Sequence, residues 1–353
     1  NAWCKLPETE RTTQNLLSQL DFDFFEVLDA VTIARSRRHI QTYYNTKDIG
    51  TFPTRNKPIS LYPKLTDKQG AINYREVYEC LSDLKLTIYT PTQFILPSKL
   101  SKYLSEEETE NFRKGREAGI QRLMSINLLK RMESSVHSFL LTVKRVYQYI
   151  YDTDQTIASF IKNASGKLTE MTDLSFVASD FDDDDQNTDF FSVGKKVQID
   201  LRDMDYISWK RDMEADLDTL ALLISMIEDI TSEYDYKLNQ LLQVIQEKEA
   251  KPINPGNRKI LIFTAFADTA EYLYEHVAPK AKALGLHTAL VTGSVEGRTT
   301  IPNFQPEMNH VLSCFSPVSK DRDVLYPKDK GNNIDILIGT DCISEGQNLQ
   351  DCD

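Results

Sequence analysis

Short apolar runs alternate with amphipathic stretches in the C-terminal part of the chain. The runs at residues 259–264, 287–292 and 334–338 have the length and composition of buried strands. Residues 268–284 have the three-to-four spacing of an amphipathic helix, which we expect Gly285 to end. Strand, helix and strand in this order predict a β-α-β unit, so the fold class is α/β.

The middle of the chain has helical periodicity and predicts a mainly helical region over residues 71–255, which makes the protein helix-rich overall. We expect a helix at residues 74–84 and a long one at 106–151, interrupted near Gly115 and Gly119. Within the long helix, Arg131 and Glu133 are expected to lie on a solvated face with salt bridges.

A heptad-like spacing over residues 209–248 predicts a further long helix. It can pack against the helix at 120–150 as an antiparallel hairpin, or self-associate with a second chain. The hairpin is favoured because the chain itself offers a partner helix. Pro252 and Gly256 then break helix and mark the boundary of a last domain at 256–353.

Charge is unevenly distributed along the chain. The formal net charge of -12 argues against indiscriminate attraction to nucleic acid. Acidic residues crowd into 170–189, which we expect to be a mobile loop and no metal site, because consecutive aspartates cannot converge on one cation. Residues 31–68 are locally basic and include Arg35, Arg37 and Arg38, a candidate contact to nucleic acid or an ordinary solvated turn.

Composition indicates a globular protein without membrane-spanning segments. A chain of 353 residues with 41% hydrophobic residues can form two or three domains. No apolar run approaches the roughly twenty residues that span a bilayer, and the N-terminus lacks a signal segment, so we expect a cytoplasmic protein with no membrane partner. Its five scattered cysteines are expected to be reduced thiols.

The most informative stretch is the strand at 334–338 with the loop after it. The loop contains, in order, Thr340, Asp341, Glu345, Gly346, Asn348, Leu349 and Gln350. This pattern resembles motif V of superfamily-two helicases and translocases of the Swi/Snf-like branch. An ordinary strand-to-helix turn, with Gly346 chosen for its backbone freedom, is the alternative.

Three other segments share the resemblance. Residues 260–266 resemble motif IV, and residues 128–139 resemble the helix that opens the second lobe in a bacterial subgroup. An Arg-Arg pair followed by a Phe-Pro-x-Arg-like segment, within 1–70, resembles the end of the first lobe after motif III. The resemblance implies a partial RecA-like lobe of the P-loop NTPase type, with 71–255 as a large helical insertion.

The resemblance also implies roles for individual residues. Thr340 would offer its hydroxyl to a phosphate of the nucleic-acid strand, and further backbone contacts would come from Thr264, Thr292, Gly293 and Ser294. Thr264 is equally well explained as a strand-end hydroxyl that bonds to its own backbone.

The remaining motif V residues would couple this contact to the nucleotide. These residues are Asp341, Glu345, Gly346, Asn348 and Gln350. Gly346 would let the backbone approach closely, and Glu345 and Asn348 would hold the shape of the loop or face the nucleotide. Asp341 is alternatively a helix cap.

ATP hydrolysis by such a motor needs a Gly-Lys-Ser/Thr loop and an acidic pair that binds magnesium. The sequence has neither. We therefore expect a fragment that runs from the end of lobe one to motif V, without catalytic residues, whose parent protein binds ATP and Mg²⁺. The expected partners are nucleic acid, DNA rather than RNA, and the first lobe of the same protein. The alternative is a non-enzymatic helical scaffold with a degenerate lobe.

Overall fold

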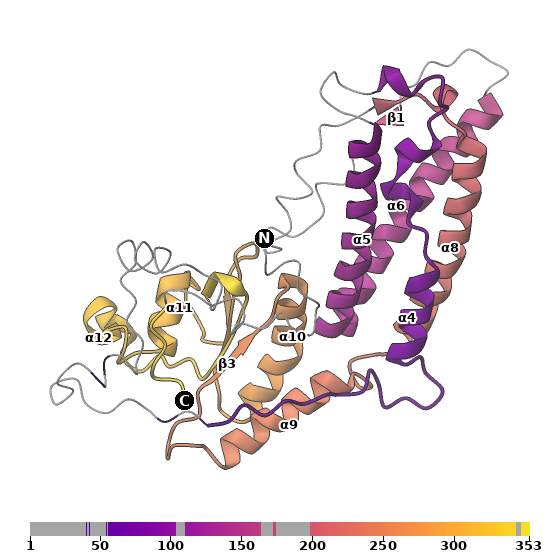
Figure 1. The fold of residues 1–353 in the computed structure, drawn as a ribbon. Coiled ribbons are helices and arrows are strands. Elements are labelled where there is room, and N and C mark those ends of the chain that lie inside the picture. The colour runs from indigo at the N-terminus through magenta and orange to yellow at the C-terminus, as the bar shows by residue number, and fades with distance from the viewer. Residues whose placement is uncertain are drawn as a thin grey trace. The chain divides into compact units, whose positions relative to one another are not determined.

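A computed structural model describes residues 40, 42, 54, 56–103, 110–163, 172–173, 198–343 and 347–353 (Figure 1). The chain divides into two compact units, Asn1–Leu61 and Tyr62–Asp353, and the second contains both the sheet and the helical core. Several sequence-based predictions fall outside the described residues: the basic cluster Arg35, Arg37 and Arg38, the acidic stretch 170–189 apart from 172–173, and the loop residues Glu345 and Gly346.

Four strands form one sheet in the order β3-β6-β4-β5. β3 (Ile260–Phe263), β6 (Ile336–Gly339) and β4 (Thr288–Val291) are parallel, and β5 (Arg298–Thr299) is antiparallel to β4. The helix α10 (Ala267–Ala283) connects β3 to β4, and Gly285, with a φ of 73°, follows its end. The β-α-β unit and the later strand were predicted from their apolar runs and are confirmed.

Helices cover both faces of the sheet, and the inner strands β6 and β4 are buried on two sides (Figure 1). On one face, Leu290 and Ile338 pack with α9 (Tyr236–Ala250) and α10. On the other, Leu337 and the alternate residues of β4 pack with α11 (Met308–Phe315). Two-sided burial is the physical reason that these strands are continuously apolar in the sequence.

A second core lies among α4 (Tyr74–Asp83), α5 (Glu110–Ser134), α6 (Val136–Asn163) and α8 (Tyr206–Glu228). Ion pairs join Lys144 to Glu228 and Lys210 to Asp154, so α8 runs antiparallel to α6. The apolar face of α8, which includes the fully buried Trp209, packs within the chain, so the antiparallel packing that the sequence favoured is confirmed for the α8 part of residues 209–248.

The predicted interruption of the long helix is misplaced. Gly115 and Gly119 lie inside α5, where a glycine lowers helix stability by only about 1 kcal/mol relative to alanine and no atom outside the helix comes within 4 Å of the Cβ position. The break falls at Ser135, whose hydroxyl accepts a hydrogen bond from the Ser138 amide at 3.0 Å. Ser135 therefore caps α6, because serine at this position satisfies an amide that the helix leaves open.

Residues 209–248 form two helices, α8 and α9, and the prediction of one continuous helix is wrong. Only Thr231, in the gap, breaks the apolar spacing. α8 ends at Glu228, and Asp235 begins α9 as its N-cap by accepting the Leu238 amide at 3.0 Å. α8 then belongs to the helical core and α9 to the sheet.

The remaining elements are short. β1 (Thr172–Asp173) pairs antiparallel with β2 (Gln198–Ile199). The others are α12 (Arg322–Leu325) and the 3-10 helices η3 (Thr87–Tyr89), η4 (Pro91–Phe94), η5 (Leu100–Lys102), η6 (Leu201–Asp203), η7 (Pro327–Asp329) and η8 (Asp341–Ile343). Residues 56–64 form neither helix nor strand. None of the described helices has the length and apolarity needed to cross a membrane.

Candidate functional site at the carboxyl edge of the sheet

Three threonines follow the last residues of the three parallel strands. Thr264 follows β3, Thr340 follows β6 and Thr292 follows β4, and the strand ends are in register at Gly339. The Thr264 amide donates to the Gly339 carbonyl at 3.0 Å, and the Thr340 amide donates to the Val291 carbonyl at 3.4 Å. The three predicted contact residues therefore lie side by side at one level of the sheet edge, where open α/β sheets place their ligands.

Two of the three hydroxyls bond to their own loops. In residues 264–266, which we call the β3 loop, the Thr264 hydroxyl accepts the Phe266 amide at 3.3 Å. In residues 292–295, the β4 loop, the Thr292 hydroxyl accepts the Val295 amide at 2.9 Å. The self-bonded alternative for Thr264 is thus present in this structure. Gly293 and Ser294 are exposed at the tip of the β4 loop.

The third threonine is buried. Thr340 is 1% exposed, and its hydroxyl donates to the Cys342 sulfur at 3.6 Å. A Cβ on the neighbouring Gly339 would lie 3.1 Å from the Val291 carbonyl and closer still to the Ile343 side chain. The chain turns tightly here and continues into η8, whose first residue, Asp341, is exposed. A phosphate can reach the Thr340 hydroxyl only if this turn rearranges.

The end of the candidate motif V packs against the loop after α11. The exposed Asn348 donates to the Ser319 carbonyl at 3.2 Å, and Gln350 is exposed. Asp351 accepts the amides of Val318 at 2.7 Å and Ser319 at 3.0 Å. Burial alone would raise the pKa of Asp351, but these bonds and the Ser319 hydroxyl lower it below its usual value. The ionised Asp351 carboxylate therefore holds this segment against the loop after α11.

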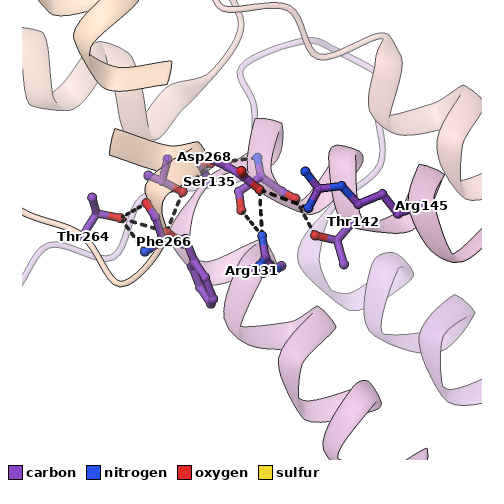
Figure 2. Close-up of polar contacts among 10 residues, drawn as sticks. Arg131, Ser135, Thr142, Arg145, Thr264, Phe266 and Asp268 are labelled. Atoms are coloured by element: carbon purple, nitrogen blue, oxygen red, sulfur yellow. Dashed lines mark hydrogen bonds and ion pairs between the residues drawn. The ribbon is translucent and has the colours of Figure 1, made fainter. Parts of the chain in front are cut away.

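Arg131 was expected on a solvated face, and this expectation is wrong, whereas Glu133 is exposed. Arg131 is 1% exposed, and its Nη1 lies 2.8 Å from Oδ2 of Asp268, in the first turn of α10 (Figure 2). Its guanidinium carbon lies 4.4 Å from the centroid of the Phe266 ring. The segment 128–139 resembled a lobe-opening helix, but helical periodicity alone could not show which charged residue faces another domain.

Hydroxyl groups add a second set of contacts at the same place. The Ser134 hydroxyl lies 2.8 Å from that of Thr269 and 3.4 Å from that of Thr264. The Ser135 hydroxyl lies 3.0 Å from that of Thr269. Lys237 donates to the carbonyl of Ser134 at 3.0 Å, where it neutralises the end of α5, and burial lowers the pKa of this lysine.

A cavity of about 690 Å³ lies beside the β3 loop. It is lined by the ends of α5 and β3, the first turns of α9 and α10, and Asp341. Its polar lining comprises Lys130, Glu133, Ser134, Ser135, Asp235, Lys237, Thr264, Thr269, Tyr272 and Asp341. The signs of charge are mixed, which does not favour a free anion as the ligand. Among the residues that the structure describes, no cluster of His, Cys, Asp or Glu is arranged to hold a metal.

Comparison with protein-family models and with curated proteins finds no match for this chain. The resemblance to helicases therefore depends on the motifs and on the geometry that they adopt.

Proposed function

We propose that the chain carries part of the second, RecA-like motor lobe of an ATP-dependent Swi/Snf-like helicase or DNA translocase. The observation that supports this most is the alignment of Thr264, Thr340 and Thr292 at the ends of three adjacent parallel strands. Two of these threonines lie in segments that resemble motifs IV and V. The third precedes the exposed Gly293 and Ser294, where the family contacts the backbone of nucleic acid.

The chemistry of this edge suits a phosphate backbone. Strand ends and tight turns present amides and hydroxyls, which bind phosphate without reading sequence, as a translocase requires. With a net charge of -12, the chain has no broad electrostatic attraction to DNA, so binding depends on this local surface. ATP and Mg²⁺ would be held by other parts of the parent protein, because the chain has no phosphate-binding loop.

The buried Thr340 supports a two-state surface. The β4 loop can contact a strand directly, whereas Thr340 requires a change in the turn that follows β6. A nucleotide that favours one arrangement of this turn would change the affinity for nucleic acid, which is the coupling that a translocase needs.

Binding of the chain to fluorescein-labelled single- and double-stranded DNA, followed by anisotropy at several salt concentrations, tests the proposal. We expect affinity to fall with salt, with a slope that reports the number of phosphate contacts. Ser294→Asp places a negative charge at the exposed tip of the β4 loop and should weaken binding by about tenfold. Ser82→Asp, the same change at an exposed site on α4, is the matched control and should leave the Kd unchanged.

Absent or salt-insensitive binding would contradict the proposal and favour the scaffold, in which the same elements serve protein contacts only. In the parent protein, ATP hydrolysis should be stimulated more by DNA than by RNA. Stimulation by RNA alone would reassign the substrate.

A further inference from the structure

Beyond the backbone bond of Thr264 to β6, the β3 loop has little support on the side of the cavity. Ala265 is exposed, and the cavity of about 690 Å³ borders Thr264, Ala265 and Phe266 on one side. Side chains next to a void lose packing contacts, so packing alone does not define where this loop lies. Within the loop, the Thr264 hydroxyl bonds to both the amide and the carbonyl of Phe266, each at 3.3 Å. The Thr264 amide is fixed to the Gly339 carbonyl at 3.0 Å, so contacts from outside the loop are needed to hold the Thr264 side chain and the two residues that follow it.

Helix α5 supplies those groups from a segment more than a hundred residues earlier in the chain (Figure 2). The Arg131 guanidinium stacks over Phe266, the last residue of the loop, and bonds to Asp268, two residues further on. Its Nη1 also donates to the Ser138 hydroxyl at 3.2 Å, across the break between α5 and α6. Arg131 therefore bridges the β3 loop and the helix break with one rigid, planar group.

Ser134 makes a second, independent bridge from the same helix end. Its hydroxyl lies 3.4 Å from the Thr264 hydroxyl and 2.8 Å from that of Thr269, the residue after Asp268. We infer that Arg131 is a positioning residue: through Phe266 and Asp268 it holds the β3 loop so that Thr264 stays level with Thr340 and Thr292 at the sheet edge. The functional part of this inference rests on the proposed binding of nucleic acid.

The chemistry of the pair favours positioning over a simple gain in stability. A buried ion pair contributes little net stability because desolvating both charges offsets their attraction, whereas its directional bonds fix geometry. Arginine is the residue that can stack on a ring and pair with a carboxylate at the same time. A lysine at this position keeps the charge but cannot do both.

Hydrogen exchange and DNA affinity in Arg131→Lys test this inference. We expect faster exchange at the amides of Phe266 and Ala270, which bond to Thr264 and to the Phe266 carbonyl, and DNA binding weaker by about three- to tenfold. Exchange in β4 and α8 should stay as in the wild type. Arg122→Lys, the same change at an exposed position of α5, is the matched control and should alter neither quantity.

Ser134→Ala serves as a second variant, because it leaves the ion pair intact and removes the hydroxyl bridge. It should also speed exchange at Phe266 and weaken binding. If Arg131→Lys exchanges and binds as the wild type does, the inference is overturned while the proposed function stands; faster exchange with unchanged affinity overturns it too. If the wild-type chain does not bind DNA, the proposed function fails, and local exchange still decides whether Arg131 holds the loop.

Discussion

The β3 loop and the β4 loop begin with the same residue type at the same level of the sheet, yet they are held differently. In each, a threonine hydroxyl accepts an amide of its own loop, from Phe266 and Val295 respectively. The β3 loop is also joined to α5 through Arg131 and Ser134, whereas the described contacts of the Thr292 side chain stay within its own turn. A strand end can therefore be placed by local turn chemistry, or by a distant helix that couples it to another part of the fold.

The largest expected effect comes from removing the carboxylate that pairs with Arg131. Asp268→Ala removes the carboxylate that pairs with a guanidinium that is 1% exposed, which should lower the free energy of unfolding by about 3–5 kcal/mol. Glu275→Ala, also on α10, breaks an exposed pair with Arg298 on the β5 side and should cost less than about 1 kcal/mol. Urea denaturation followed by circular dichroism measures both. Equal losses of stability in the two variants would show that the ion pair beside the β3 loop matters no more than the exposed pair on the β5 side.

The strand between the two loops gives the next largest effect. Gly339→Ala places a Cβ against Ile343 and the Val291 carbonyl, and overpacking of this kind should destabilise by about 1–3 kcal/mol. Gly119→Ala, on an exposed part of α5 with open space around it, should stabilise by about 0.5–1 kcal/mol. Thermal unfolding should therefore show shifts of opposite sign. A stabilising Gly339→Ala would mean that the turn after β6 is loosely packed.

Removing the threonine hydroxyls tests the comparison directly. Thr264→Val and Thr292→Val should each lower stability by about 0.5–1.5 kcal/mol, because each leaves an amide without its acceptor. In a double-mutant cycle with Ser134→Ala, only Thr264→Val should be non-additive, since Ser134 lies against Thr264. Additivity at Thr264 would show that the β3 loop is as self-contained as the β4 loop.

The smallest effect concerns Asp351, in the segment after β6. The pKa of Asp351 is lowered in the folded protein, so its stabilising contribution is complete above the unfolded value near 3.9 and is lost as pH falls through the lower folded value. Asp351→Asn should therefore reduce stability by up to about 1 kcal/mol at pH 7, a modest amount because the carboxylate is partly exposed. Denaturation curves of wild type and variant should converge below pH 4. A gap that persists there would assign the effect to hydrogen-bond geometry instead of charge.

Local patterns in the sequence predicted the elements whose causes are themselves local. The strands were predictable because burial on both faces requires continuous apolar runs, and the end of α10 was predictable from Gly285. Thr264, Thr292 and Thr340 were singled out because of the resemblance to helicase motifs, and their alignment comes from the register of the three parallel strands.

The missed features depend on contacts between distant segments. The helices on either side of Ser135, and those on either side of the gap before Asp235, all have apolar faces. The three-to-four spacing of apolar residues therefore gives little sign of either break. The break itself is set by one capping hydroxyl or carboxylate. The burial of Arg131 depends on Asp268, which is 137 positions later in the chain. No local pattern in the sequence links these two residues.

For this protein the sequence by itself determined an α/β unit after a mainly helical region, and which polar residues directly follow its strands, because apolar periodicity reports burial directly. The tertiary structure alone decided that α8 and α9 belong to different cores, that Thr340 is buried, and that a helix end holds the β3 loop. Those features arise from side chains that meet only after folding, and a charged residue that will be buried by a distant partner has the same local pattern as one that remains in water.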